Sequence, residues 1–338
     1  MSSSPETPRK ISPEDTLPPV EPPNAGFIIQ LFVVPAVIVA IIVVVWTLFN
    51  WLAQMGNDPM SFVRALERNN EARWQAAVNL ADALRDPRNS DLKQNVAVAE
   101  KLAEILTTEI ETKPADKSSL QLRVYLCNAL GEFTVPEVVP ALIRAATAGR
   151  EPDEKYVRFA AIKGLAVFAG NLKPGDAALR AQIEPVMLKA SSDDEPLMRS
   201  TAAFALGALR GEKAIERLKQ MLVDANPNVR FNAATMLASD GSMAAEPVLL
   251  EMLDTKSTSG LEIEDEKELR EQKQETILIS ALRAVKKLAD AHPSADLSKL
   301  KAAVTAVSSS KLAPRVRSEA LEVLKELDQR SPKPAGAK

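Results

Sequence analysis

Residues 198–253 read MRSTAAFALGALRGEKAIERLKQMLVDANPNVRFNAATMLASDGSMAAEPVLLEML, which is one pattern written twice. Each copy has an arginine, an alanine three residues later and a leucine seven residues later, and a second apolar helical segment follows. Positions three, four and seven after the arginine lie on one face of a helix with about 3.6 residues per turn. The stretch therefore predicts a repeat made of paired amphipathic helices.

The same spacing recurs along most of the chain. The arginine and the leucine seven residues later occur as Arg73/Leu80, Arg123/Leu130, Arg158/Leu165, Arg199/Leu206, Arg230/Leu237 and Arg317/Leu324, with a degenerate copy at Glu275/Leu282. One helix pair alone cannot bury such a face, so neighbouring pairs must stack on one another. We therefore expect an all-α solenoid over residues 71–330, with about six helix pairs and a terminal capping helix.

Composition agrees with this fold class and limits the partners. Aromatic residues make up 4% of the 338 residues and there are only 12 glycines, which suits helices packed through small aliphatic side chains. The 42 basic and 45 acidic residues nearly cancel, leaving a formal charge of −3, so no global field attracts nucleic acid. The single cysteine, Cys127, excludes an intrachain disulfide.

Residues 27–52, FIIQLFVVPAVIVAIIVVVWTLFNWL, form an uncharged apolar segment. About 20 such residues suffice for a helix to cross a bilayer. A cleaved signal peptide has a basic start, an apolar run of about 7–15 residues and a small-residue cleavage site, and a buried solenoid helix has a polar stripe. The segment fits neither alternative. We therefore predict a permanent single-pass transmembrane helix, with an aromatic belt at its C-terminal end formed by Trp46, Phe49 and Trp51.

The flanking segments complete the predicted organisation. Residues 1–26 are rich in proline and acidic residues and 331–338 in small and charged ones, so both are expected to be disordered tails. Residues 53–70 are expected to form a juxtamembrane helix or linker. The basic residues near the anchor favour, by one charge, a solenoid on the cytoplasmic side: Arg64, Arg68 and Arg73 follow the anchor, whereas Arg9 and Lys10 precede it.

Two of the repeats share a further feature in the turn before the arginine. Asp193 and Asp224 stand six residues before Arg199 and Arg230, in the turns SSDDEPLMR and VDANPNVR. This arrangement resembles the HEAT repeat and the HEAT-like repeats of phycobilisome lyases, and the resemblance extends over residues 71–330. It implies a HEAT-like α-solenoid in which such Asp and Arg residues join adjacent repeats through charge-assisted hydrogen bonds.

Not every copy has the aspartate. The position six residues before the arginine is occupied by Glu67, Lys117 and Pro152 in the copies of Arg73, Arg123 and Arg158. The resemblance therefore implies the link between repeats only for the two regular copies.

The sequence offers little for catalysis. Its one histidine, His292, lies beside Pro293 at a predicted helix end, and one histidine with one cysteine cannot form a Cys/His metal cluster. No glycine-rich phosphate loop and no GxSxG motif is present. We therefore predict no catalytic residue, no cofactor and no metal site. The arginines are spaced one per repeat, so we interpret them as part of the scaffold; nucleic acid is an unlikely partner, because its binding sites cluster basic and aromatic residues.

These observations favour a membrane-anchored, non-catalytic scaffold or adaptor whose concave face binds a protein or peptide, with the contacting residues on the second helix of each pair. One alternative is a lyase-like or cofactor-handling enzyme, because some relatives of the resembled repeats attach bilins to partner proteins. Another is a nucleic-acid-binding solenoid. The acidic insertion at 254–267 is expected to be a solvated loop.

Overall fold

The computed structural model describes residues 25–55, 60–68, 73–112, 117–149, 152–173, 175–262 and 264–330. Of the predicted tails, residues 1–24 and 331–338 lie outside the described residues, whereas residues 25 and 26 of the N-terminal tail predicted at 1–26 belong to the first helix. The chain forms two compact units, Met1–Asp58 and Pro59–Lys338. Every regular element in the described ranges is a helix, which confirms the predicted all-α class.

The first unit contains helix α1 (Ala25–Met55), a single helix of 31 residues with Pro35 inside it. It is longer than the predicted span at 27–52. Its central part, Ile29–Phe49, has a mean hydropathy of 3.0, and none of it is buried within the structure. By length and composition, α1 is able to cross a membrane.

The second unit consists of alternating helices. The helices that carry the repeated arginine, called first helices from here on, are α3 (Arg73–Arg85), α6 (Lys117–Gly131), α8 (Glu154–Gly170), α10 (Pro196–Leu209), α12 (Pro227–Ser239), α14 (Lys267–Ala291) and α16 (Pro314–Arg330). The second helices are α5 (Val96–Thr112), α7 (Val139–Ala146), α9 (Ala177–Ala190), α11 (Glu212–Met221), α13 (Glu246–Leu253) and α15 (Ser298–Ser308). Each first helix packs on the next one, from α3 to α16. The described residues thus form six helix pairs followed by α16, as predicted.

Short helical elements complete the turns within the pairs: η2 (Pro87–Asn89), α4 (Ser90–Lys93), η3 (Pro136–Val138) and η4 (Met243–Ala245). Helix α2 (Met60–Glu67), within the predicted juxtamembrane segment, packs on α3 and α5 and buries Val63 and Leu66. Residues 60–67 therefore belong to the solenoid rather than to a free linker.

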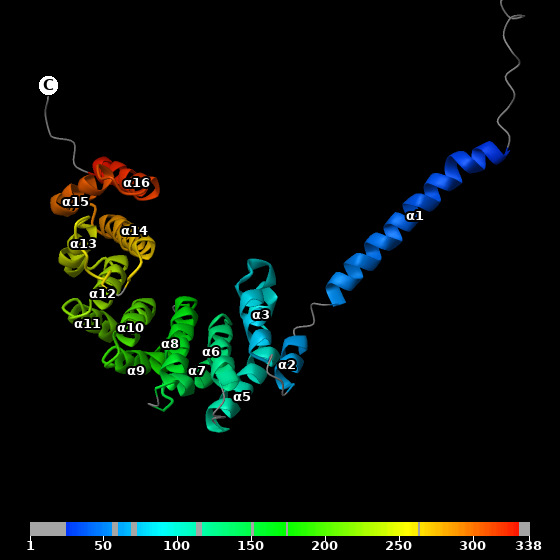
Figure 1. Cartoon of the computed structure of the whole chain (residues 1–338), viewed down its shortest axis with the longest axis horizontal. Coiled ribbons are helices and arrows are strands. Elements are labelled where there is room, and N and C mark those ends of the chain that lie inside the picture. The colour runs from blue at the N-terminus through cyan, green and yellow to red at the C-terminus, as the bar shows by residue number, and fades with distance from the viewer. Residues whose placement is uncertain are drawn as a thin grey trace, which may run out of the picture. The chain divides into compact units, whose positions relative to one another are not determined.

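The first helices lie on the inner side of the arc that the second unit forms, and the second helices lie on its outer side (Figure 1). Side chains of the first helices therefore form the concave surface, whereas we had expected the partner-contacting residues on the second helices. The inner row is able to pack closely because its helices carry small residues at their contacts. At one contact, a Cβ atom added to Gly131 of α6 would lie 2.4 Å from the Cα atom of Gly164 in α8.

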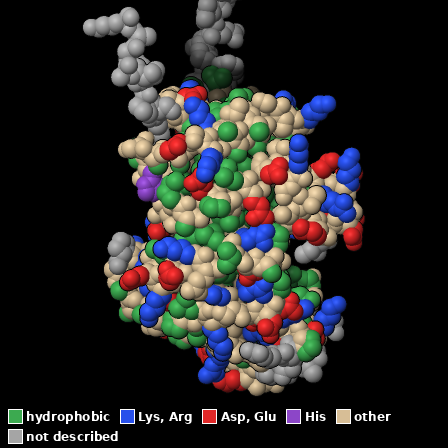
Figure 2. All heavy atoms as spheres, turned by 90° about the vertical axis from the view of Figure 1, so that its left-hand side faces the viewer, with side chains coloured by type: hydrophobic (Ala, Val, Ile, Leu, Met, Phe, Trp, Pro, Cys, Tyr) green, Lys and Arg blue, Asp and Glu red, His purple; other side chains and the backbone are tan. Residues whose placement is uncertain are grey.

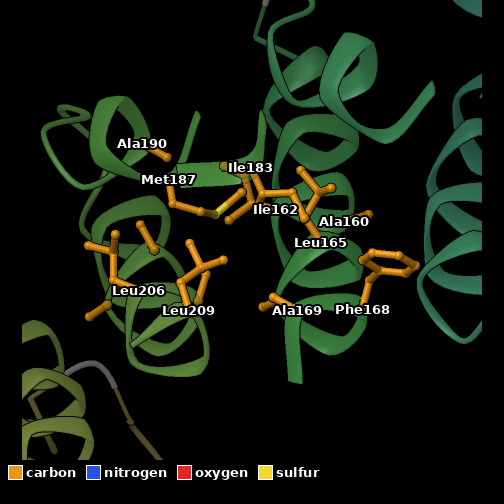
Figure 3. Close-up of a cluster of buried hydrophobic side chains, with 14 of the residues drawn as sticks. Ala160, Ile162, Leu165, Phe168, Ala169, Ile183, Met187, Ala190, Leu206 and Leu209 are labelled. Atoms are coloured by element: carbon orange, nitrogen blue, oxygen red, sulfur yellow. The ribbon is translucent and has the colours of Figure 1, made fainter. Parts of the chain in front are cut away.

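The core is formed between neighbouring repeats. Figure 3 shows Ile162 and Leu165 from α8, Ile183 and Met187 from α9, and Leu206 and Leu209 from α10, all pointing into one cluster. The leucines seven residues after the arginine are fully buried in six copies: Leu80, Leu130, Leu165, Leu206, Leu237 and Leu282.

The copy at the C-terminal end differs from the others. Leu324 of α16 is only half-buried, and Leu321, at the fourth position after Arg317, is 58% exposed. In the preceding copies the residue at the fourth position is buried. The repeated spacing predicts that Leu321 is buried like its counterparts; that prediction was wrong, because among the described residues α16 packs only on α14 and α15.

The insertion between α13 and α14 is folded against the solenoid. Leu261 is buried, and Gly260 has a φ of +82° that brings its backbone against Phe231 of α12. On the other side, Gln274 of α14 donates a hydrogen bond to the Thr255 carbonyl at 3.1 Å. The insertion is therefore held by α12 and α14, while most of its charged side chains are exposed to solvent, as expected of a solvated loop.

Candidate partner-binding surface of the first helices

Four of the repeated arginines bind acidic side chains of their own or the next helix pair, and Arg199 makes the most complete set of these contacts. Its Nε and Nη2 donate hydrogen bonds to the two carboxylate oxygens of Asp224, at 2.8 and 2.9 Å. Its Nη1 donates to the main-chain carbonyls of Asp193 and Asp194, at 3.0 and 2.9 Å. One guanidinium thus closes the turn of its own repeat and binds the turn of the next.

The contact between Arg199 and Asp224 shifts the pKa values of both side chains. The hydrogen bonds from Arg199, together with one from the backbone N–H of Asn226, hold the pKa of Asp224 below its usual value, although partial burial opposes this shift. The pKa of Arg199 is correspondingly raised by its hydrogen bonds to Asp224. Both groups are therefore charged at neutral pH, and the pair is a charge-assisted link.

Three other repeated arginines bind glutamates, and the positions of these glutamates differ. Arg73 pairs with Glu109 of α5 at 2.9 Å, Arg123 with Glu154 of α8 at 2.5 Å, and Arg230 with Glu251 of α13 at 2.5 Å. Arg123 and Glu154 are both almost fully buried. The aspartate pattern did not predict these partners. Arg317, on the last helix, is exposed.

Arg158 of α8 differs from these four. Its Nη1 donates to the Gly149 carbonyl at 2.7 Å, and among the described contacts it has no carboxylate partner. Asp193 occupies the same place in its turn as Asp224, and its side chain accepts a hydrogen bond from the Glu195 N–H at 3.0 Å. Arg158 and Asp193 instead line a cavity of about 380 Å³. The pairing with a carboxylate that the other four arginines make is therefore not formed here.

Large apolar side chains are exposed on the concave side of α8 and α10. Positions two before and five after the repeated arginine lie on the helix face opposite the buried leucine. These positions hold Tyr156, Leu197 and Phe204, which are 52%, 58% and 46% exposed. We call these three residues the apolar patch.

Cationic side chains adjoin the apolar patch. The Lys155 amine lies 5.5 Å from the centroid of the Tyr156 ring and 3.8 Å from a carboxylate oxygen of Glu195. Lys163 is exposed on the same helix. On the opposite, outer side of the second unit, Figure 2 shows basic and acidic side chains intermingled without a continuous patch of one sign.

The two residues considered for catalysis both have structural surroundings. Cys127 is completely buried, and burial raises the pKa of its thiol. A ring nitrogen of His292 is hydrogen-bonded to the Gly241 carbonyl, which joins the end of α14 to the turn after α12. A cavity of about 580 Å³ beside His292 is lined mainly by the turn between α14 and α15. In the part of the chain that the structure describes, no group of three His, Cys, Asp or Glu residues has the geometry of a metal site.

Comparison with protein families agrees with this architecture. A model of HEAT repeats matches residues 183–263, which include the turns of Asp193 and Asp224. A model of a HEAT-like repeat matches residues 155–209. These matches identify residues 155–263 as HEAT repeats, as the resemblance implied for this part of the chain, but neither match identifies the lyase-type repeats in particular.

Solved structures give more distant likenesses. They include an engineered protein (16% identity, 81% of this chain and 98% of that chain, TM-score 0.39) and a designed armadillo repeat protein (14%, 74% and 98%, TM-score 0.35). Human deoxyhypusine hydroxylase in complex with glycerol is also similar (17%, 82% and 99%, TM-score 0.33). At these TM-scores none of the three bears on the function of this chain. No curated protein matches the sequence.

Proposed function

We propose that this protein is a membrane-anchored, non-catalytic scaffold that binds a protein or peptide on the concave surface of its HEAT-repeat solenoid. The observation that carries the proposal is the apolar patch of Tyr156, Leu197 and Phe204, three large side chains exposed on adjacent first helices. Exposed aromatic and large aliphatic side chains with charged residues beside them are typical of the centre and rim of a protein interface.

The insertion at 254–267 supports the proposal that the partner binds near α8 and α10. It packs against Phe231 of α12, where Phe231 itself is buried. The first helices α8 and α10 present their apolar side chains without such a cover among the described residues. A partner with an apolar surface and acidic flanks complements the patch and the neighbouring Lys155 and Lys163.

The anchor is the second part of the proposal. Helix α1 has the length and apolar character of a transmembrane helix, and the basic residues that follow it favour a cytoplasmic solenoid. Tethering raises the local concentration of the solenoid at the membrane surface, so a modest affinity for the partner suffices. Binding by surface complementarity requires no catalytic group.

Photo-crosslinking of the full-length, membrane-bound chain tests the binding surface. A photoreactive amino acid at Phe204 should give an adduct of one discrete mass, and the additional substitution Tyr156→Asp should abolish that adduct. Val223, which is 85% exposed and lies in the turn after α11, is the matched control and should give no such adduct. An equal yield at positions 204 and 223, or an adduct that does not depend on Tyr156, would refute this surface.

A further inference from the structure

The cavity between Arg158 and Asp193 is the point where the series of Arg–carboxylate pairs is interrupted. Its wall is formed by the ends of α7 and α9 and the beginning of α10, together with Arg158 of α8. We call it the Arg158 pocket. Its polar side chains are Arg158, Lys189, Ser192, Asp193 and Thr147.

The neighbouring repeat shows what a complete pair looks like. Asp224 accepts two hydrogen bonds from Arg199 and one from the Asn226 N–H at 2.8 Å. Asp193 makes only the hydrogen bond from the backbone. Arg158 has one hydrogen bond, from Nη1, so among the described contacts its Nε and Nη2 have no acceptor. These are the two atoms that Arg199 uses to bind its carboxylate.

We propose that the Arg158 pocket binds an aspartate or glutamate side chain of the partner, which pairs with Nε and Nη2 of Arg158 as Asp224 pairs with the same atoms of Arg199. A guanidinium presents two parallel N–H groups that match a carboxylate, and Lys189 supplies a second positive charge at the mouth of the pocket. Asp193 favours a singly charged carboxylate over a dianionic phosphate, because it adds a negative charge to the same cavity. About 380 Å³ is ample for one acidic side chain.

The pocket is placed to act together with the apolar patch. Tyr156 and Leu197 stand in the first turns of α8 and α10, two residues before Arg158 and Arg199. Met198, directly after Leu197, lines the pocket. Arg158 lies on the helix face opposite Tyr156, so a partner segment that covers the apolar patch must pass around the N-terminal ends of α8 and α10 to bring an acidic residue to the pocket. This inference rests on the proposed function, since the carboxylate is the partner's.

Carbodiimide coupling on the full-length chain in membranes tests the inference directly. The reagent joins a carboxylate to a lysine amine in contact with it, forming an amide while the reagent takes up the elements of water and leaves as a urea. We expect an amide between Lys189 and an acidic residue of the partner, mapped by mass spectrometry of the crosslinked peptides. Lys219, which stands just before the complete Arg199–Asp224 pair in the next repeat, is the matched control and should form no amide with the partner; its amine lies 3.9 Å from Glu216 of its own chain, so an intrachain amide there does not count.

Two variants separate this inference from the proposed function. Lys189→Arg should abolish the amide, because the reagent does not couple a carboxylate to a guanidinium. Arg158→Gln should lower the yield of the photo-adduct about tenfold at limiting partner, the effect of losing one charge-assisted pair. The coupling at Lys189 is read on the unsubstituted chain, so it does not depend on the folding of a variant.

The outcomes are distinct. A photo-adduct at position 204 without an amide at Lys189, and unchanged by Arg158→Gln, overturns the carboxylate site and leaves the scaffold proposal standing. Loss of both the photo-adduct and the amide overturns both. An amide at Lys219 as well as at Lys189 shows that any exposed lysine is coupled, and this also overturns the inference.

Discussion

Arg199 donates hydrogen bonds of 2.8 and 2.9 Å to the two carboxylate oxygens of Asp224, across 25 residues of sequence. The pair joins the beginning of α10 to the turn that precedes α12, so it fixes one repeat on the next. Because its side chains are largely shielded from water, it contributes more than an exposed ion pair of the same geometry.

Replacing Asp224 with asparagine should therefore destabilise the solenoid in a pH-dependent way. The pKa of Asp224 is lowered in the folded state by Arg199, so its contribution is present above the unfolded pKa of about 3.9 and is lost as pH falls through the folded pKa. We expect Asp224→Asn to lower the free energy of unfolding by about 1–3 kcal/mol at pH 7, with the difference shrinking below about pH 4.

Urea unfolding of the two proteins between pH 3 and pH 7 measures this difference. Asp240→Asn, which changes an exposed aspartate after α12, is the control and should have an effect within about 0.5 kcal/mol at every pH. A difference for Asp224→Asn that stays constant down to pH 3 would contradict the assignment of the stabilisation to the charged pair.

The helix register could be predicted from the sequence, but most of the charged partners could not. The spacing of Arg199 and Leu206 repeats because each helix must bury the same face. The acidic partners of Arg73, Arg123 and Arg230 lie 36, 31 and 21 residues away, because a glutamate from any nearby helix end satisfies the same guanidinium. No fixed spacing therefore reveals them.

The proposed binding surface could not be predicted from the sequence either. Asp193 and Asp224 occupy the same place in their sequence repeats, yet only Asp224 binds an arginine of the preceding repeat. The cavity beside Arg158 depends on how two repeats pack on one another. The sequence of a single repeat does not determine that packing. The side on which the solenoid curves is also a property of the stack, so the sequence did not place the first helices on the concave side.

Gly164 should be far more sensitive to substitution than another glycine in the same helix. A Cβ atom at Gly164 would lie 2.7 Å from the Cys127 carbonyl oxygen, whereas a Cβ atom at Gly170 would meet nothing within 4 Å. Because the obstacle is backbone, Gly164→Ala should force α6 and α8 apart and cost about 1–3 kcal/mol.

Gly170→Ala is the matched control in α8. It should change the free energy of unfolding by no more than about 1 kcal/mol, because the added methyl group meets no other atom and alanine is the better helix former. Thermal unfolding followed by circular dichroism compares the two. Equal melting temperatures for the two variants would show that α6 and α8 do not pack as closely as the structure has them.

The rate at which Cys127 is labelled should report the separation of α6 from α8. Its thiol is fully buried and burial raises its pKa, so both access and the thiolate fraction are low in the folded chain. We expect a maleimide at pH 8 to label Cys127 at least about 100-fold more slowly in the native chain than in urea, because labelling waits for local unfolding. Gly164→Ala should accelerate native labelling and Gly170→Ala should not. Native labelling at the rate seen in urea would place Cys127 at the surface.

The orientation of the anchor follows from a difference of one charge and is therefore open to reversal. Arg64, Arg68 and Arg73 follow α1 closely, against Arg9 and Lys10 before it. In spheroplasts of a bacterial host, a C-terminal tag should therefore resist external protease until the membrane is opened. Arg64→Gln with Arg68→Gln shifts the excess to the N-terminal side, so part of the population should expose its tag. Digestion of the unsubstituted protein's tag in intact spheroplasts would place the solenoid outside, and the partner would then be sought among envelope proteins instead of cytoplasmic ones.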